Sequence, residues 1–296
     1  MTLRVIRTTS ITEAMLAYSS VAEDTNPAWS AGETCGLGAL RHLASTHRVY
    51  AAAAAGNVGH DPSTSPTWWT DAGATNRWAM FDGALGRSTT SATDVTVRLQ
   101  PGAVSGLALM GVQARRVRIA IRDTVSGATV YDRTFSLSAV TIGNWLEYFT
   151  APFTYRTEFA NTALPLYSQG ELEVTLYGNG QQDVVCAELV VGTAVDLGVP
   201  TYGAKLGITD YSRKDTDAWG NTTLVQRAFA RTLDIGFKLD GAQLERVYAT
   251  LGELRATPCV WLADGLPAIY GWVGDFSIDV RAQTHSFCNL QIKGLT

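Results

Sequence analysis

The sequence predicts a mostly β protein divided into three modules, and three observations lead to this prediction. Short segments of alternating apolar and polar residues recur along the chain, as expected for strands with one buried face. Turn-forming residues separate these segments at intervals of roughly 8–12 residues, which is typical of a β-sandwich or jelly roll. One segment, at about 240–255, has the apolar spacing of an amphipathic helix.

The composition sets limits on size and on partners. A chain of 296 residues is long enough for two or three domains at about 100–150 residues each. Only 17% of the residues are charged, so the surface must rely on Ser, Thr, Asn and Gly, which is common in β proteins. The formal net charge of −4 provides no basic field for binding DNA or RNA through counterion release. We therefore expect no nucleic-acid partner.

The chain shows no sign of export or of membrane insertion. The segment that starts at Met1 lacks the apolar run of a signal peptide. No stretch approaches the ~18 apolar residues of a membrane span. We expect a protein that is made in a cytoplasm, has no membrane span and reaches the cell exterior, if at all, by a route such as lysis.

The cysteines do not predict a metal site. They are widely spaced and contain no C-x-x-C pair, so a zinc ribbon is not expected. We predict buried, reduced cysteines that behave as small hydrophobic residues. Cys35 with His42 and His47 is the one combination that suggests metal ligands, and a loop cysteine near two unrelated histidines is the favoured interpretation. No metal and no cofactor are predicted. The cysteines are Cys35, Cys186, Cys259 and Cys288.

The first module, residues 1–80, is rich in loops and tryptophan. Glycine and proline interrupt it repeatedly, and Val49-Tyr50-Ala51 is its clearest strand. The module resembles the small chitin-binding-type carbohydrate-binding modules that many phage tail proteins also carry. The resemblance rests on an ordered series of residues: Trp29, Gly32, Val49-Tyr50-Ala51, Gly59, Pro62 and Trp68-Trp69.

This resemblance implies a glycan site made of aromatic rings, because exposed Trp and Tyr rings stack on the apolar face of a pyranose. The candidate glycan-binding residues are Trp29, Tyr50, Trp68 and Trp69. The alternative is that the same rings form the small core of the module.

The second module, residues 81–200, is predicted to be a sandwich. Residues 94–99 place Val95, Val97 and Leu99 on one face. The order of features resembles the galactose-binding-like, jelly-roll β-sandwich of many lectin domains, in which loops at one end often bind sugar. No loop shows a convergent set of acids and aromatics, so this module is predicted to be scaffold. Glu171 and Glu173 are expected on one solvated sheet face. Further strands are expected at 117–122, 129–132, 145–149, 171–177 and 184–192.

The third module, residues 201–296, combines strands with the single helix. Asp240 followed by Gln243 predicts a capping box at the start of that helix. A calcium loop starting at Asp215 fails because Trp219 and Gln226 stand where ligands are needed, so a solvated polar loop is expected. Strands are expected at 223–230, 233–239, 259–262, 268–273, 275–280 and 287–292.

The stretch Asn76–Gly83 lies between the first two modules. Its aromatic residues favour burial, whereas a flexible linker would be rich in Gly and Ser. We interpret it as a fixed joint, and an ordinary first strand of the second module is the compatible alternative.

The third module and this joint together resemble minor tail and baseplate proteins of tailed bacteriophages. The resemblance implies a virion protein near the distal end of the tail, made in the host cytoplasm, homo-oligomeric within the tail and bound to other tail proteins. A strand-rich domain with one helix is also the general plan of tail-tube and hub proteins, whose sheets join between subunits. The matching stretches are Asn76–Asp82, Ser212–Asp217, Trp219–Asn221, Leu254–Pro258, Val260-Trp261, Asp275–Asp279 and Gly294-Leu295.

The sequence does not predict an enzyme. It contains no G-x-S-x-G, no H-E-x-x-H and no P-loop, and its carboxylates have no spacing that would pair them. The predicted function is a structural component of a phage tail tip or baseplate, with a host-surface polysaccharide as a further partner. The alternative is a free-standing glycan-binding lectin or adhesin without a virion role.

Overall fold

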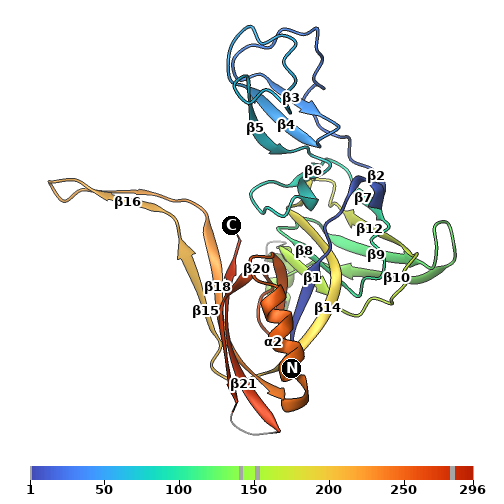
Figure 1. Ribbon diagram of the computed structural model, residues 1–296, viewed down its shortest axis with the longest axis vertical. Coiled ribbons are helices and arrows are strands. Elements are labelled where there is room, and N and C mark those ends of the chain that lie inside the picture. The colour runs from blue at the N-terminus through green and yellow to red at the C-terminus, as the bar shows by residue number, and fades with distance from the viewer. Residues whose placement is uncertain (1, 140–142, 151–153, 281–283, 296) are drawn as a thin grey trace.

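The computed structural model describes residues 2–139, 143–150, 154–280 and 284–295. The protein is mostly β, as predicted, and its strands form several sheets (Figure 1). Helix α2 (Leu244–Glu253) lies inside the predicted helical segment. The predicted strand at Trp145–Phe149 is wrong, because these residues form the short helix α1 (Trp145–Thr150). In the helix, Trp145 and Phe149 lie four residues apart and their rings stack at 6.5 Å.

Six antiparallel strands form a barrel. The sheet closes because its last strand pairs with its first: Val199 pairs with Lys238, and Pro200 pairs with Phe237. Their order around the barrel is β14 (Glu188–Pro200), β1 (Leu3–Thr8), β19 (Cys259–Ala263), β20 (Ile269–Val280), β21 (His285–Gly294) and β18 (Phe229–Asp240).

The barrel takes strands from all three predicted modules. Strand β1 pairs with β14 on one side and with β19 on the other, although the predicted boundaries assign it to the module 1–80. The physical reason is burial, because Leu3, Val5 and Ile6 have no exposed surface. Such a strand needs a large sheet with both faces covered, and the small module has none.

The barrel core also anchors helix α2. Val247 and Leu251 of the helix are buried among side chains from the strands, including Trp261 and Phe237. The predicted capping box is wrong, because Asp240 makes no side-chain cap and the short 3₁₀ turn η3 (Gly241–Gln243) precedes the helix. The helix is therefore held by its apolar face rather than by its first turn.

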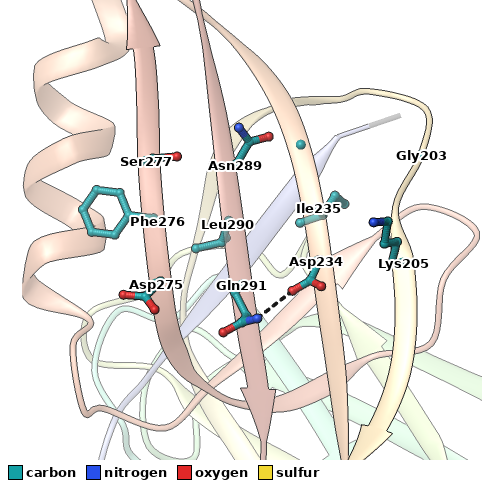
Figure 2. A pocket seen from close by; sticks show the side chains of 11 residues that line it. Gly203, Lys205, Asp234, Ile235, Asp275, Phe276, Ser277, Asn289, Leu290 and Gln291 are labelled. Carbon is teal, nitrogen blue, oxygen red and sulfur yellow. Dashed lines mark hydrogen bonds between the residues drawn. The ribbon is translucent and has the colours of Figure 1, made fainter.

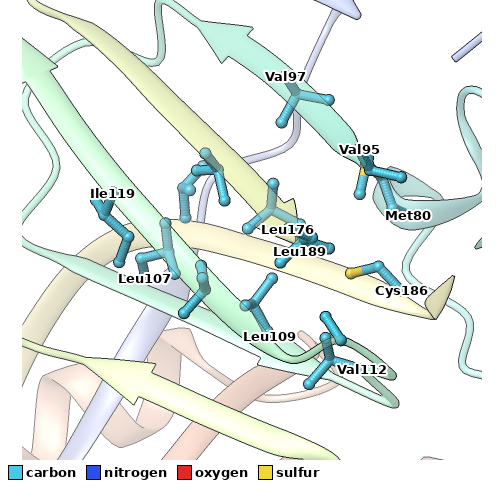
Figure 3. Close-up of a cluster of buried hydrophobic side chains, with 14 of the residues drawn as sticks. Met80, Val95, Val97, Leu107, Leu109, Val112, Ile119, Leu176, Cys186 and Leu189 are labelled. Carbon is cyan, nitrogen blue, oxygen red and sulfur yellow. The ribbon is translucent and has the colours of Figure 1, made fainter. Parts of the chain in front are cut away.

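The sandwich uses the other half of β14. Residues 188–192 of that strand pair with β8 (Gly106–Met110), which pairs in turn with β11 (Glu158–Asn161). This sheet faces a five-stranded sheet. Leu109 and Leu189 from the first sheet pack with Val97, Ile119 and Leu176 from the second (Figure 3). The strands are β8 (Gly106–Met110), β11 (Glu158–Asn161), β10 (Thr129–Ser136), β9 (Arg116–Arg122), β12 (Glu171–Tyr177), β7 (Val95–Leu99) and β2 (Leu16–Ser19), with the flanking pair β6 (Thr89–Ser91) and β13 (Val184–Cys186); the short 3₁₀ turn η1 (Glu13–Met15) precedes β2.

The outer face of the five-stranded sheet carries paired charges. Glu171 and Glu173 share this face, as predicted, but they are not solvated: Glu171 is 4% exposed. Arg122 donates to Glu171 at 2.8 Å, and Arg118 donates to Glu173 at 2.9 Å. The arginines of the neighbouring strand cover the carboxylates, so this face is a set of ion pairs rather than an open acidic surface.

The small module is a three-stranded sheet of β3 (Leu40–Leu43), β4 (Arg48–Ala52) and β5 (Trp69–Ala74). The predicted strand at Val49-Tyr50-Ala51 is confirmed by β4. The module has a core of its own around Cys35, Tyr50 and Trp69. In Figure 1 it stands apart from the barrel, at one end of the molecule.

The joint Asn76–Gly83 is packed and not extended. It contains the 3₁₀ turn η2 (Ala79–Phe81) instead of a strand. Trp78 stacks on His47 of the small module at 4.2 Å, and Met80 is buried in the sandwich core (Figure 3). The Gly83 N–H donates to the Glu188 carboxylate at the start of β14. The joint therefore contacts the small module through Trp78, the sandwich core through Met80 and the start of β14 through Gly83.

Gly192 marks the point where β14 passes from the sandwich into the barrel. A Cβ atom at this position would lie 1.7 Å from the carbonyl oxygen of Arg7. This oxygen belongs to the backbone of β1, which pairs with β14 here and cannot move without breaking the ladder. Only glycine fits at this crossing.

We predict that Gly192→Ala destabilises the fold by about 3 kcal/mol or more, because a methyl group would push two paired strands apart. Denaturant unfolding followed by circular dichroism measures this. The matched control is Gly252→Ala in helix α2, where nothing lies within 4 Å of the added Cβ. That substitution should stabilise the protein by about 0.5–1 kcal/mol through helix propensity. Equal effects of the two substitutions would contradict the close contact.

Candidate functional site

The predicted aromatic site is partly buried. Tyr50 and Trp69 are 8% and 3% exposed, and both belong to the core of the small module. The Trp69 indole N–H donates to the carbonyl oxygen of His60 at 2.9 Å. These two rings have no face free for a sugar, so for them the structure agrees with the alternative that they form the core.

Trp29 and Trp68 keep part of their surface exposed. His60, which the sequence analysis did not select, stacks on Trp68 with ring centres 4.2 Å apart and an angle of 11° between planes. His60 therefore covers one face of the indole. A sugar has access only to the uncovered part of the Trp68 ring and to the exposed part of Trp29. Together these two surfaces form a small aromatic platform.

The cysteines and histidines do not form a metal centre. All four cysteines are free and buried, as predicted. The His42 ring contacts the carbonyl oxygen of Asn26, and the His47 ring contacts Glu23 and Trp78. Within the described residues, no three His, Cys, Asp or Glu side chains are placed to hold a metal ion.

The most conspicuous surface feature is a projecting hairpin arm, residues 205–229. It consists of β15 (Lys205–Asp210), β16 (Arg213–Thr216), β17 (Thr222–Val225) and the start of β18. Figure 1 shows it extending away from the barrel. All its residues are exposed except the half-buried Ser212. Its exposed large apolar side chains are Leu206, Ile208, Tyr211, Trp219, Leu224, Val225 and Phe229.

The tip of the arm is an ordered turn. The Asp217 carboxylate accepts backbone N–H groups of Trp219 and Asn221 at 2.9 and 2.8 Å and an amide N–H from the Asn221 side chain. These hydrogen bonds, that of the Asn221 side chain first, lower the pKa of Asp217. The turn holds the Trp219 side chain, 88% exposed, at the end of the hairpin. Asp217 thus stabilises a turn, and the polar loop is a hairpin tip.

A hollow of about 440 Å³ lies on the outer face of the barrel at the base of the arm (Figure 2). Lys205 and Asp234 line it on one side, and Asp275 lines it on the other. The Gln291 side-chain amide donates to Asp234 at 3.1 Å. Its polar side chains are open to solvent, so the hollow fits a hydrated contact surface better than a catalytic cleft, which needs shielded groups.

A buried carboxyl group lies where the joint meets the barrel. Glu188 is 2% exposed and lines a hollow of about 190 Å³ together with Asp82 and Tyr270. Burial raises the pKa of Glu188 to about 8, the Asp82 charge adds to this effect, and the Gly83 N–H opposes it. Burial also raises the pKa values of Asp82 and Tyr270. At neutral pH Glu188 is therefore largely protonated. No local pattern in the sequence indicates this, because the burial of Glu188 depends on distant segments.

The chain matches no protein-family model and no curated protein sequence. Among the described residues, no helix is long and apolar enough to cross a membrane.

We predict that the protein loses stability as the pH rises from about 4.5 to about 8, through Glu188. The folded state keeps the proton up to a pKa of about 8, whereas the unfolded chain releases it near 4.5. Unfolding therefore releases a proton in this window, and the free energy of unfolding falls with pH. Glu188→Gln should remove a cost on the order of a few kcal/mol at pH 8 while keeping an acceptor for Gly83.

Denaturant unfolding at pH 5, 6, 7, 8 and 9 tests this prediction. The difference between the Gln variant and the wild type should grow up to pH 8 and then remain constant. Glu245→Gln, at an exposed position on α2, is the control and should show a constant difference. Parallel curves for Glu188→Gln and the wild type would show that Glu188 titrates normally.

Proposed function

We propose that this protein is a structural component of a bacteriophage tail tip or baseplate that assembles with further copies of itself and with other tail proteins. The observation that carries the proposal is the hairpin arm. A two-stranded hairpin is marginally stable alone in water, and this one exposes a row of apolar side chains. A neighbouring subunit that covers the arm would bury those side chains and stabilise the hairpin.

The edges of the sheets support the same proposal. Strand β15 pairs with β18 on one side only, and the other edge of its backbone is open within the described residues. Open strand edges invite pairing with another chain, and a closed ring of subunits uses such edges without leaving one to aggregate. The resemblance to tail-tube and hub proteins, whose sheets join between subunits, agrees with this arrangement.

The host-surface glycan contact is the second part of the proposal. Trp29 and Trp68 are the predicted residues that keep exposed ring surface. A free-standing lectin is the alternative function, and it would use the same rings as a monomer. The arm favours the virion role, because a monomeric lectin has no need for an exposed apolar hairpin.

Labelling of whole phage particles with antibodies against this chain tests the proposal. Electron microscopy should show label at one end of the tail. If intact and denatured tails both remain unlabelled while cells or soluble fractions react, the virion role is wrong and the lectin alternative gains support.

We predict that removing the tip of the arm prevents assembly but leaves the fold intact. In the variant, a two-residue Asn-Gly turn replaces residues 212–227, so that Asp210 still pairs with Phe229. Sedimentation should show loss of higher oligomers, and the variant should not enter particles when it is the only copy supplied. The melting temperature should change by only a few degrees, because the barrel core contains none of the removed residues.

A point-substitution pair provides the control. Trp219→Ser removes an apolar side chain from the arm, and Leu37→Ser removes one that is 72% exposed in the small module. Only the arm substitution should weaken assembly. Assembly of the truncated chain at wild-type levels would exclude the arm as the contact.

A further inference from the structure

The loop end of the sandwich contains a polar groove of about 840 Å³. It is formed by segments that are far apart in the sequence, before β9, after β10, before β11 and after β12. From its sequence the sandwich is predicted to be scaffold, because no single loop carries a binding pattern. The lining residues are Arg115, Ser136, Ser138, Tyr155, Asn179, Gln181 and Gln182.

Hydrogen bonds hold the walls of the groove in place. The Arg115 backbone N–H donates to Tyr177 at 2.8 Å, and its carbonyl oxygen accepts from Leu137 at 3.1 Å. The Asn179 side-chain oxygen accepts the N–H groups of Gln181 and Gln182 at 2.9 and 3.0 Å, which fixes the loop after β12. A ligand would meet these side chains on a backbone that is already ordered, which lowers the entropy cost of binding.

The groove offers unused hydrogen-bonding groups. Within the described residues, the Arg115 guanidinium and the Tyr155 hydroxyl have no side-chain hydrogen bond or ion pair. The Gln182 carbonyl oxygen accepts from Gln113 at 3.4 Å, so its NH₂ group remains available. Ser136 accepts a backbone N–H, so its hydroxyl hydrogen remains available.

The balance of these groups indicates the ligand. Among the described lining residues, arginine, amide and hydroxyl groups supply more donors than acceptors, and none of these residues is a carboxylate. Asp183 lines only a smaller hollow beside it. The guanidinium pairs with planar anionic groups in a two-pronged geometry, and the half-buried Tyr155 ring provides a flat apolar surface.

We propose that this groove binds a short anionic, hydroxyl-rich chain, an acidic oligosaccharide or a polyol phosphate: the Arg115 guanidinium pairs with the anionic group, and the amides of Gln181 and Gln182 bind hydroxyl groups. The anion is a sugar carboxylate or a phosphate in a polyol chain, since both present oxygen pairs to arginine. A volume of about 840 Å³ is within the range of small-ligand pockets. This site deepens the proposed host-surface contact, but it lies on the sandwich and not on the small module.

Calorimetric titration of the full chain tests the proposal with three probes: trigalacturonate, a short poly(glycerol phosphate) and neutral trigalactose. At least one anionic probe should bind, at least about tenfold more tightly than the neutral sugar, and added salt should weaken that binding. The anionic probe that binds identifies the source of the charge. Because the test uses the free chain, its result is separate from that of the particle labelling.

Variants identify the groove. Arg115→Gln should weaken binding of the anionic probe about tenfold or more. Tyr155→Phe removes only a hydroxyl and should weaken the same binding several-fold, which keeps the test available if Arg115→Gln fails to fold. The matched control is Arg156→Gln, at an exposed position next to the groove but outside its lining, which should leave affinity unchanged. No binding of either anionic probe, equal losses for Arg115→Gln and Arg156→Gln, or loss on Trp68→Ala would overturn the proposal.

Discussion

The structure depends on one shared strand. The first part of β14 pairs with β8 in the sandwich, the middle pairs with β1 in the barrel, and the last two residues pair with β18. A strand that is common to two cores cannot shift in one without moving in the other, because a change of register would turn its buried side chains outward. Gly192 is the residue that permits this, since the backbone of β1 occupies the space of a side chain there.

The same arrangement explains why the chain does not separate into independent modules. Ile6 of β1 packs with Val190 of β14 and Val260 of β19, while Leu3 and Val5 point into the barrel core. The joint adds a contact at the beginning of β14, where Gly83 meets Glu188. The buried Glu188 keeps its proton at neutral pH, where the unfolded chain would release it, so this contact costs free energy that the surrounding packing offsets. The arm and the groove are therefore attached to one continuous framework.

Local patterns in the sequence were sufficient for much of the fold. Alternation in residues 94–99 predicts β7 with Val95, Val97 and Leu99 buried, and the spacing from Leu244 onward predicts α2. The predictions failed where distant contacts decide. Strand β1 is the clearest case, because its pairing with β14 and β19 decides its place in the barrel. The strand predicted at Trp145–Phe149 failed for a local reason instead, since the spacing of these two rings suits the helix that forms.

The candidate sites show the same division. The aromatic rings of the small module were visible in the sequence, but nothing local separated the buried Tyr50 and Trp69 from the partly exposed Trp29 and Trp68. The groove could not be predicted at all, because Arg115, Tyr155 and Gln181 approach one another only after β9, β11 and β12 have taken their places in the sandwich. Sites of this kind depend on the order of strands, which periodicity does not report.

The two surfaces differ in what they need in the isolated chain. The arm exposes apolar side chains, whose contact with water is unfavourable until another surface covers them. The groove exposes arginine and amide groups, which water hydrates well, so it can remain open without loss of stability. The proposed assembly and the proposed ligand binding therefore do not compete for the same driving force. A subunit whose arm is buried by its neighbour would still present the groove, and this separation is what a structural protein that also contacts a cell surface requires.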